Sequence, residues 1–237
     1  SIVEWKPVSG ALPPLTAEDW QHNFDLYKTS PQYQKVNMGM SLDDFKHIYF
    51  WEWLHRLLGR VIGILYFIPF VYFTWRKKIP ADAQNPLWGI LVLGFLQGAL
   101  GWFMVKSGLV DAPAVSHYRL AAHLTLAVLI FCCLLYMGSS LSLTRRIPVQ
   151  KISLYLHIKF SIVLVGITMI WGAFVAGLRA GHIYTTFPLM GNKLWPGEMF
   201  FLSPAWLNFF ENHATVQFTH RLLAMTTLVT LLALAWR

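Results

Sequence analysis

The stretch FWEWLHRLLGRVIGILYFIPFVYFTW, residues 50–75, decides the fold of this chain. Its last part, residues 61–75, is uncharged and mostly apolar. A helix needs about 20 mostly apolar residues to cross the hydrocarbon core of a bilayer, so this span must include part of the polar stretch that precedes it. That stretch contains Glu52, His55, Arg56 and Arg60. The sequence therefore predicts a membrane-spanning helix with ionisable side chains at one end.

The composition of the whole chain agrees with this interpretation. Of its 237 residues, 56% are hydrophobic and only 13% are charged, which is too apolar for an ordinary soluble domain. Five uncharged stretches predict five spans, at residues 61–75, 83–105, 120–144, 160–178 and 222–236. The predicted fold class is all-α, a polytopic transmembrane helical bundle.

The short loops indicate the orientation of the spans, because Lys and Arg are enriched on the cytoplasmic side. Two connections are basic, and they contain Arg76, Lys77 and Lys78, and Arg145, Arg146 and Lys151. We therefore expect both connections to face inside, and the N-terminal segment, the link 107–116 and the connection 179–215 to face outside. The net charge of +8 is mostly this topology signal, and no nucleic-acid motif competes with it.

Two outer segments are predicted to have structure of their own. Thr16 with Asp19, and Ser41 with Asp44, resemble helix N-cap pairs, so residues 1–46 should form short outer helices. The connection 180–215 is too apolar for a solvated loop, and we expect it to fold back onto the outer membrane surface. The only two cysteines, Cys132 and Cys133, are adjacent within a span and predict packing rather than disulfides or metal ligands.

Three histidines fall within about three turns of the outer end of a predicted inward-running span: His55, His123 and His220. A single intramembrane histidine is usually a packing residue, but three at one depth, each with an arginine nearby, indicate ligands. Zinc sites usually bring cysteines, carboxylates or closely spaced histidines. A haem fits better, since its iron takes axial histidines and its propionates bind arginines. The candidate propionate partners, which could instead extend to the outer headgroups, are Arg56, Arg60, Arg119 and Arg221.

A repeated motif relates the two halves of the chain, but its two copies differ at one position. HRLL occurs at residues 55–58 and again at 220–223, as expected of a duplicated helical unit. Three residues before each histidine the copies differ, with Glu52 in the first and Gln217 in the second. Glu52 should share the helix face of His55. We expect this acid to be functional, although a salt bridge to a neighbouring arginine would also explain it.

The motifs together resemble the haem A synthase family (COX15/CtaA type) across the whole chain. They are EWKP at 4–7, MSLDDFK at 40–46, E-x-x-H-R-x-x-G-R at 52–60, QGALGWFMVKSGL at 97–109, YRLAAH at 118–123, GAFVAGL at 172–178, FPLMG at 187–191 and QFTHR at 217–221. The absence of cysteine from residues 1–46 resembles the alphaproteobacterial and mitochondrial branch, and the short link 107–116 favours the bacterial form.

The resemblance implies a pseudo-symmetric pair of four-helix bundles, of which this chain would lack the first, seventh and eighth spans. Residues 1–46 would be the outer segment, 47–144 the N-terminal half and 145–237 a truncated C-terminal half. Carried over by motif, His55 and His123 would be the ligands of the substrate, haem O, and His220 would be one ligand of haem b. The second haem b ligand would lie on the missing eighth span.

The implied activity is oxidation of the C8 methyl of haem O to the formyl group of haem A by two successive hydroxylations, in the assembly of cytochrome oxidase cofactors. Glu52 would stabilise charge on the methyl carbon or accept a proton from water. The implied partners are haem O synthase, an unknown electron acceptor, lipid and possible further copies of the chain. The expected location is a bacterial inner membrane, or else a mitochondrial one, with the haem sites near its outer side. Two other classes stay open: a di-haem cytochrome b that relays electrons, and a haem-binding assembly protein.

Overall fold

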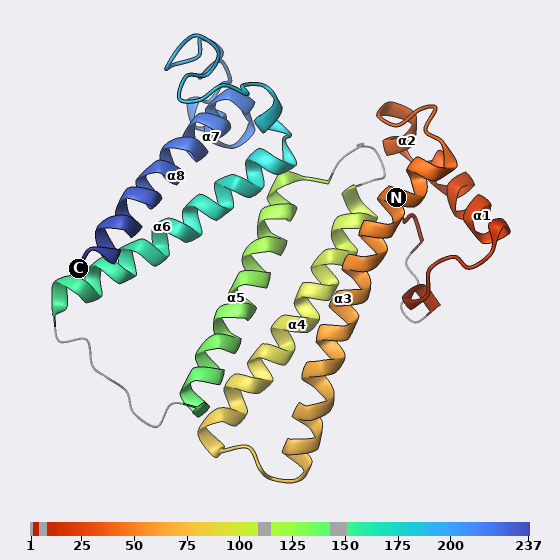
Figure 1. Ribbon diagram of the computed structural model, residues 1–237, viewed down its shortest axis with the longest axis vertical. Coiled ribbons are helices and arrows are strands. Elements are labelled where there is room, and N and C mark those ends of the chain that lie inside the picture. Colours follow the sequence, from red (N-terminus) through yellow and green to blue (C-terminus); the bar gives the residue numbers. More distant parts are fainter. Residues whose placement is uncertain (1, 5–8, 109–114, 143–150) are drawn as a thin grey trace. The chain divides into compact units, whose positions relative to one another are not determined.

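The computed structural model describes residues 2–4, 9–108, 115–142 and 151–237. Arg145 and Arg146, residues 5–7 of EWKP and most of the link 107–116 lie outside the described residues. Five helices are long and apolar enough to cross a membrane: α3 (Leu42–Trp75), α4 (Ala81–Gly108), α5 (His117–Ser142), α6 (Ile152–Gly177) and α8 (His213–Ala235). Figure 1 shows this helical architecture. The predicted all-α fold and its five spans are confirmed, and the chain is an integral membrane protein.

The chain divides into two compact units. The first contains residues 1–115 and 133–137, and the second contains residues 116–132 and 138–237. Most of α5, including its outer end, therefore belongs to the second unit. The predicted boundaries at 46/47 and 144/145 rest on the duplication of the sequence and stay predictions.

In the first unit, helix α3 extends beyond the membrane. It is 34 residues long, or about 50 Å at a rise of about 1.5 Å per residue, whereas the hydrocarbon core is about 30 Å thick. Its N-cap is Ser41, and the Ser41–Asp44 capping box predicted from the sequence is present. Helix α4 packs beside α3 (Figure 1), where the Tyr66 hydroxyl donates to the Leu87 carbonyl at 2.7 Å.

The N-terminal part of α3 is covered by the N-terminal segment. This segment forms η1 (Ser9–Ala11), α1 (Ala17–Lys28) and α2 (Pro31–Lys35), and the predicted Thr16–Asp19 capping box begins α1. An aromatic core of Phe24, Tyr27, Phe45 and Tyr49 joins α1 to α3. Since burial of large aromatic side chains is strongly stabilising, this core is what holds the outer helices on α3.

In the second unit, α6 and α8 lie side by side and antiparallel (Figure 1). Two polar contacts join them within the membrane span: the Thr168 and Thr227 hydroxyls lie 2.7 Å apart, and His157 Nε2 lies 3.1 Å from the Thr230 carbonyl. The outer end of α5 also packs here, because Ala121 shares a buried cluster with residues of α6 and α8.

The connection between α6 and α8 is built around two buried asparagines. It contains η2 (Ala180–His182), η3 (Ala205–Leu207) and α7 (Asn208–Glu211). Asn208 bonds the backbone of Leu202 and Ala205, and Asn212 caps α8 while donating to the Glu198 carbonyl. These bonds give the connection a defined structure. Its contact with the membrane surface stays a prediction.

Candidate functional site

The two predicted ligands of the substrate haem lie in different compact units. His55 is on α3 in the first unit and is exposed, whereas His123 is on α5 in the second unit and is partly buried. Both stand on helices that could span a membrane: His123 lies near the N-terminal end of α5, and His55 lies farther from the start of α3, which begins at Leu42. Their pairing around one iron stays a prediction.

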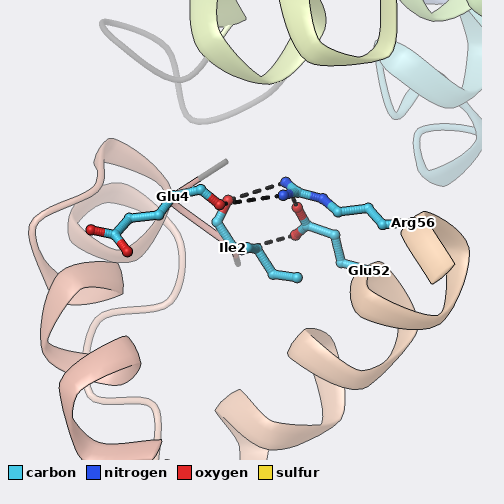
Figure 2. Close-up of polar contacts among 4 residues, drawn as sticks. All are labelled: Ile2, Glu4, Glu52 and Arg56. Atoms are coloured by element: carbon cyan, nitrogen blue, oxygen red, sulfur yellow. Dashed lines mark hydrogen bonds and ion pairs between the residues drawn. The ribbon is translucent and has the colours of Figure 1, made fainter. Parts of the chain in front are cut away.

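Glu52 forms a compact polar cluster with the N-terminal segment. Its Oε1 lies 2.5 Å from a guanidinium nitrogen of Arg56, one helical turn away, and its Oε2 accepts the Ile2 amide at 3.1 Å. Figure 2 shows both carboxylate oxygens engaged in this way. The Glu52 side chain is only 27% exposed, so a buried charge of this kind needs the pairing that it has. The salt bridge considered from the sequence is therefore present.

A cavity lies beside this cluster in the first unit. Its volume is about 240 Å³. Its lining residues include Arg56, Arg60 and Tyr49, together with Glu4 and Asp19. The structure thus brings two of the four predicted propionate partners to one cavity. Their binding of a propionate stays a prediction.

His220 occupies a close-packed position between α8 and α6. A Cβ placed on Gly172 would lie 3.0 Å from His220 Cε1, so a larger residue here would crowd this imidazole. The Nδ1 atom is buried and has no hydrogen-bond partner among the described residues. An axial haem ligand needs one ring nitrogen available for the iron. The Nδ1 atom of His220 meets this requirement, and its binding of an iron stays a prediction.

Arg221, the residue after His220, binds backbone rather than a carboxylate. Its guanidinium donates to the carbonyls of Tyr184 and Thr186, both at 2.7 Å, and more weakly to that of Leu189 at 3.3 Å. Gln217 Nε2 donates to the same Tyr184 carbonyl at 2.8 Å. The connection between α6 and α8 is thereby attached to the histidine-bearing helix.

The Tyr184 side chain adds a second attachment within this connection. Its hydroxyl donates to the Glu198 carboxylate at 2.6 Å. This bond lowers the pKa of Glu198 and raises the pKa of Tyr184, because it stabilises the ionised acid and the protonated phenol.

The remaining predicted partner, Arg119, lies on α5 and is partly buried in the second unit. Near it in sequence, the Tyr118 hydroxyl donates to Glu211 at 2.6 Å, and His117 Nε2 lies 3.7 Å from the same carboxylate. Sequence reasoning missed this group and the role of Gly172. Gly172 begins the GAFVAGL motif, so the motif was the available signal. Among the described residues, no three His, Cys, Asp or Glu side chains cluster as a metal site.

These features define a membrane protein with histidines on three of its spans and an ionisable cluster beside one of them. The chain belongs to the COX15-CtaA family, described as cytochrome oxidase assembly protein, whose model matches residues 1–237. The suspected family is confirmed.

Curated relatives agree over the whole chain. It is 49% identical over 238 residues to "Heme A synthase" of Rhodospirillum centenum, covering all of this chain and 64% of that protein. It is 51% identical over 236 residues to the protein of the same name from Parvibaculum lavamentivorans, and 49% identical over 239 residues to that of Nitrosospira multiformis, covering all of this chain and 67% of each. The chain thus spans about two thirds of the length of these relatives. No solved structure matches the chain significantly.

Proposed function

We propose that this chain is the greater part of a haem A synthase, an oxidoreductase that converts the C8 methyl of haem O to the formyl group of haem A. The single observation that carries this proposal is about 50% identity over the whole chain to proteins named "Heme A synthase". The aligned length includes all five spans and every candidate ligand, so the likeness is not confined to one motif.

The histidines have separate roles in this proposal. His55 and His123 bind the substrate haem O, and His220 is one ligand of a resident haem b. The packing of His220 against Gly172 and its available ring nitrogen support its part. When bound, haem b supplies one-electron redox chemistry. His220 itself holds and orients the group.

Glu52 is the candidate general base. Its position three residues before His55 places it on the same face of α3. Its carboxylate pairs with the adjacent Arg56 guanidinium, and a base must be ionised to take a proton. Each hydroxylation uses one water and releases two electrons and two protons. Glu52 would accept a proton from that water, the second proton would pass to solvent, and the two electrons would leave to the electron acceptor. A second such hydroxylation gives a geminal diol, which loses water to form the aldehyde.

The competing class is a di-haem cytochrome b that only relays electrons. The Glu52–Arg56 ion pair gives this class support, because the acid then has a structural use without any chemistry. Only a haem A synthase needs haem O as substrate and haem O synthase as a partner. Both classes need an electron acceptor.

The pigments of the purified full-length protein separate these two classes. A synthase should carry haem A and a hydroxylated intermediate beside haem b, and it should convert added haem O. Haem b alone, with no conversion of haem O, would favour the relay.

We further propose a bacterial inner membrane as the location, with the mitochondrial inner membrane as the alternative, and the histidines near its outer side. Single cysteines at Ser9 and Asn192 should then react with an impermeant thiol reagent from outside. Reaction only after the inner face is made accessible would reverse the orientation.

A further inference from the structure

The arginine of each HRLL repeat binds the backbone of an outer segment. In the first unit, Arg56 donates to the carbonyls of Ile2, at 3.2 Å, and Glu4, at 3.5 Å. Figure 2 shows the guanidinium facing this segment. In the second unit, Arg221 donates to the carbonyls of Tyr184 and Thr186. In both places the two carbonyls are two residues apart and the arginine directly follows the histidine.

The residue four positions before each arginine binds the same segment. Glu52 accepts the amide of Ile2, and Gln217 donates to the carbonyl of Tyr184. Ile2 and Tyr184 are also the first of the two carbonyl residues that the arginines hold. Each attachment is complete within its own compact unit, so the correspondence between them comes from two independent sets of contacts.

The chemistry of this arrangement is specific to arginine. A guanidinium presents several N–H donors in a rigid planar fork, whereas a lysine ammonium is a compact point charge on a flexible stem. Two carbonyls spaced two residues apart offer two acceptors to that fork. Hydrogen bonds from a charged donor are among the stronger ones in proteins.

The attachment also controls the helix that carries the histidine. Because Arg56 and Arg221 are each one residue from a candidate ligand, fixing the guanidinium restrains the rotation of α3 or α8 about its own axis at that point. The hydrogen bonds of the two arginines differ in length. Arg221 lies 2.7 Å from the Tyr184 and Thr186 carbonyls, whereas Arg56 lies 3.2 Å from the Ile2 carbonyl. The restraint should therefore be stronger at His220.

We propose that Arg56 and Arg221 are equivalent positioning residues, a pair of backbone clamps that hold residues 2–4 and 184–189 on α3 and α8 and so orient His55 and His220. Glu52 and Gln217 each add a hydrogen bond to the first clamped residue, Ile2 or Tyr184, and so fix which carbonyls face the arginine. The orientation of haem ligands rests on the proposed function, whereas the attachment of the outer segments does not.

Thiol labelling tests the attachment directly. Val3→Cys and Thr185→Cys place reporters between the clamped carbonyls of each segment, in a full-length protein whose Cys132 and Cys133 are replaced by alanine. Arg221→Lys should raise the labelling rate of the Thr185 reporter about tenfold, since bonds from a charged donor are replaced by a weaker contact, and should leave the Val3 reporter unchanged. Arg56→Lys should do the converse, with a smaller rise.

Matched controls separate the clamp from outer charge in general. Lys35→Gln in the first unit and Lys193→Gln in the second remove an exposed cation outside the clamps, and both should leave labelling unchanged. Unchanged labelling in the Arg→Lys variants, or an equal rise at both reporters in each, would overturn the proposal. Should a lysine variant fail to accumulate, Gln217→Leu removes one Tyr184 bond without touching an arginine, and no rise at the Thr185 reporter would overturn it equally.

Haem spectra test the orienting role. A general loss of stability would affect both haem sites, whereas a loss of ligand orientation should affect only the site in the same half as the variant. Arg221→Lys should shift the absorption and midpoint potential of haem b in folded protein, whereas Arg56→Lys should leave both unchanged and lower methyl oxidation per haem. An unshifted haem b in Arg221→Lys, with labelling changed as expected, would remove the orienting role and keep the attachment. Failure to make haem A in the wild type would count against the proposed function only, since the labelling result does not depend on it.

Discussion

The two units place the same HRLL stretch in different electrostatic surroundings. In the first, Glu52 and Arg56 form an ion pair against the N-terminal segment. In the second, the neutral Gln217 binds the connection, and the polar network continues through the buried Asn208 and Asn212. The backbone attachments are alike, so the framework does not require a carboxylate at this position. A use of the acid beyond its pairing with Arg56 and the Ile2 amide stays a prediction.

Replacement of the histidines should have the largest effect on this comparison. His55→Ala or His123→Ala in the full-length protein should abolish haem A formation and leave haem b, because only the substrate iron loses a ligand. His220→Ala should instead deplete haem b. The measurement is the pigment content of purified protein. Equal loss of both haems in every variant would mean one shared site.

Gly172→Ala should have an intermediate effect confined to the second half. The added Cβ would lie 3.0 Å from His220 Cε1, and overpacking of this kind typically costs about 1–3 kcal/mol. We expect a several-fold loss of haem b, measured per mole of folded protein. Gly166→Ala on the same helix meets nothing within 4 Å and should leave haem b unchanged. A similar loss in both variants would point to α6 itself rather than to His220.

The smallest effect should be the pH dependence of the outer connection. The lowered pKa of Glu198 means that the stabilisation by its bond to Tyr184 is complete above the ordinary carboxyl pKa and is lost as the pH falls through the folded-state value. Because the pKa of Tyr184 is raised, the same stabilisation is also lost at high pH, as the pH rises through the folded-state pKa of Tyr184.

Hydrogen exchange of residues 184–198, corrected for its intrinsic pH dependence, measures this bond. Because Glu198 is exposed, we expect protection to fall less than about threefold between pH 7 and pH 3.5. Glu198→Gln should show the lower protection already at pH 7 and no further change in acid. An unchanged profile in that variant would assign the acid effect to another group.

Much of the fold could be predicted because its signals are local. Hydropathy alone located the spans, and the Thr16–Asp19 and Ser41–Asp44 pairs located two helix starts. The salt bridge of Glu52 could also be predicted, since Arg56 lies one turn away on the same helix.

The contacts of Arg221 and Gly172 could not be predicted in the same way. Arg221 bonds carbonyls 32 to 37 residues earlier in the chain, and any residue can supply a carbonyl, so the acceptors have no side-chain signature. The closeness of Gly172 to His220 depends on how α6 packs on α8, which periodicity does not determine. Arginine was therefore assigned to propionates, although the structure also gives Arg56 and Arg221 backbone partners.

The measurement that tests the inequality of the halves most directly is haem A formed per mole of folded, haem-containing enzyme in Glu52→Gln. The glutamine copies Gln217 and can still accept the Ile2 amide, so helix packing and haem content should be nearly kept. If the carboxylate serves the reaction, this ratio should fall by about 10²-fold or more, as for loss of a general base. Wild-type turnover per haem, or loss of protein without loss of turnover per haem, would contradict the account and leave Glu52 as a member of the first clamp only.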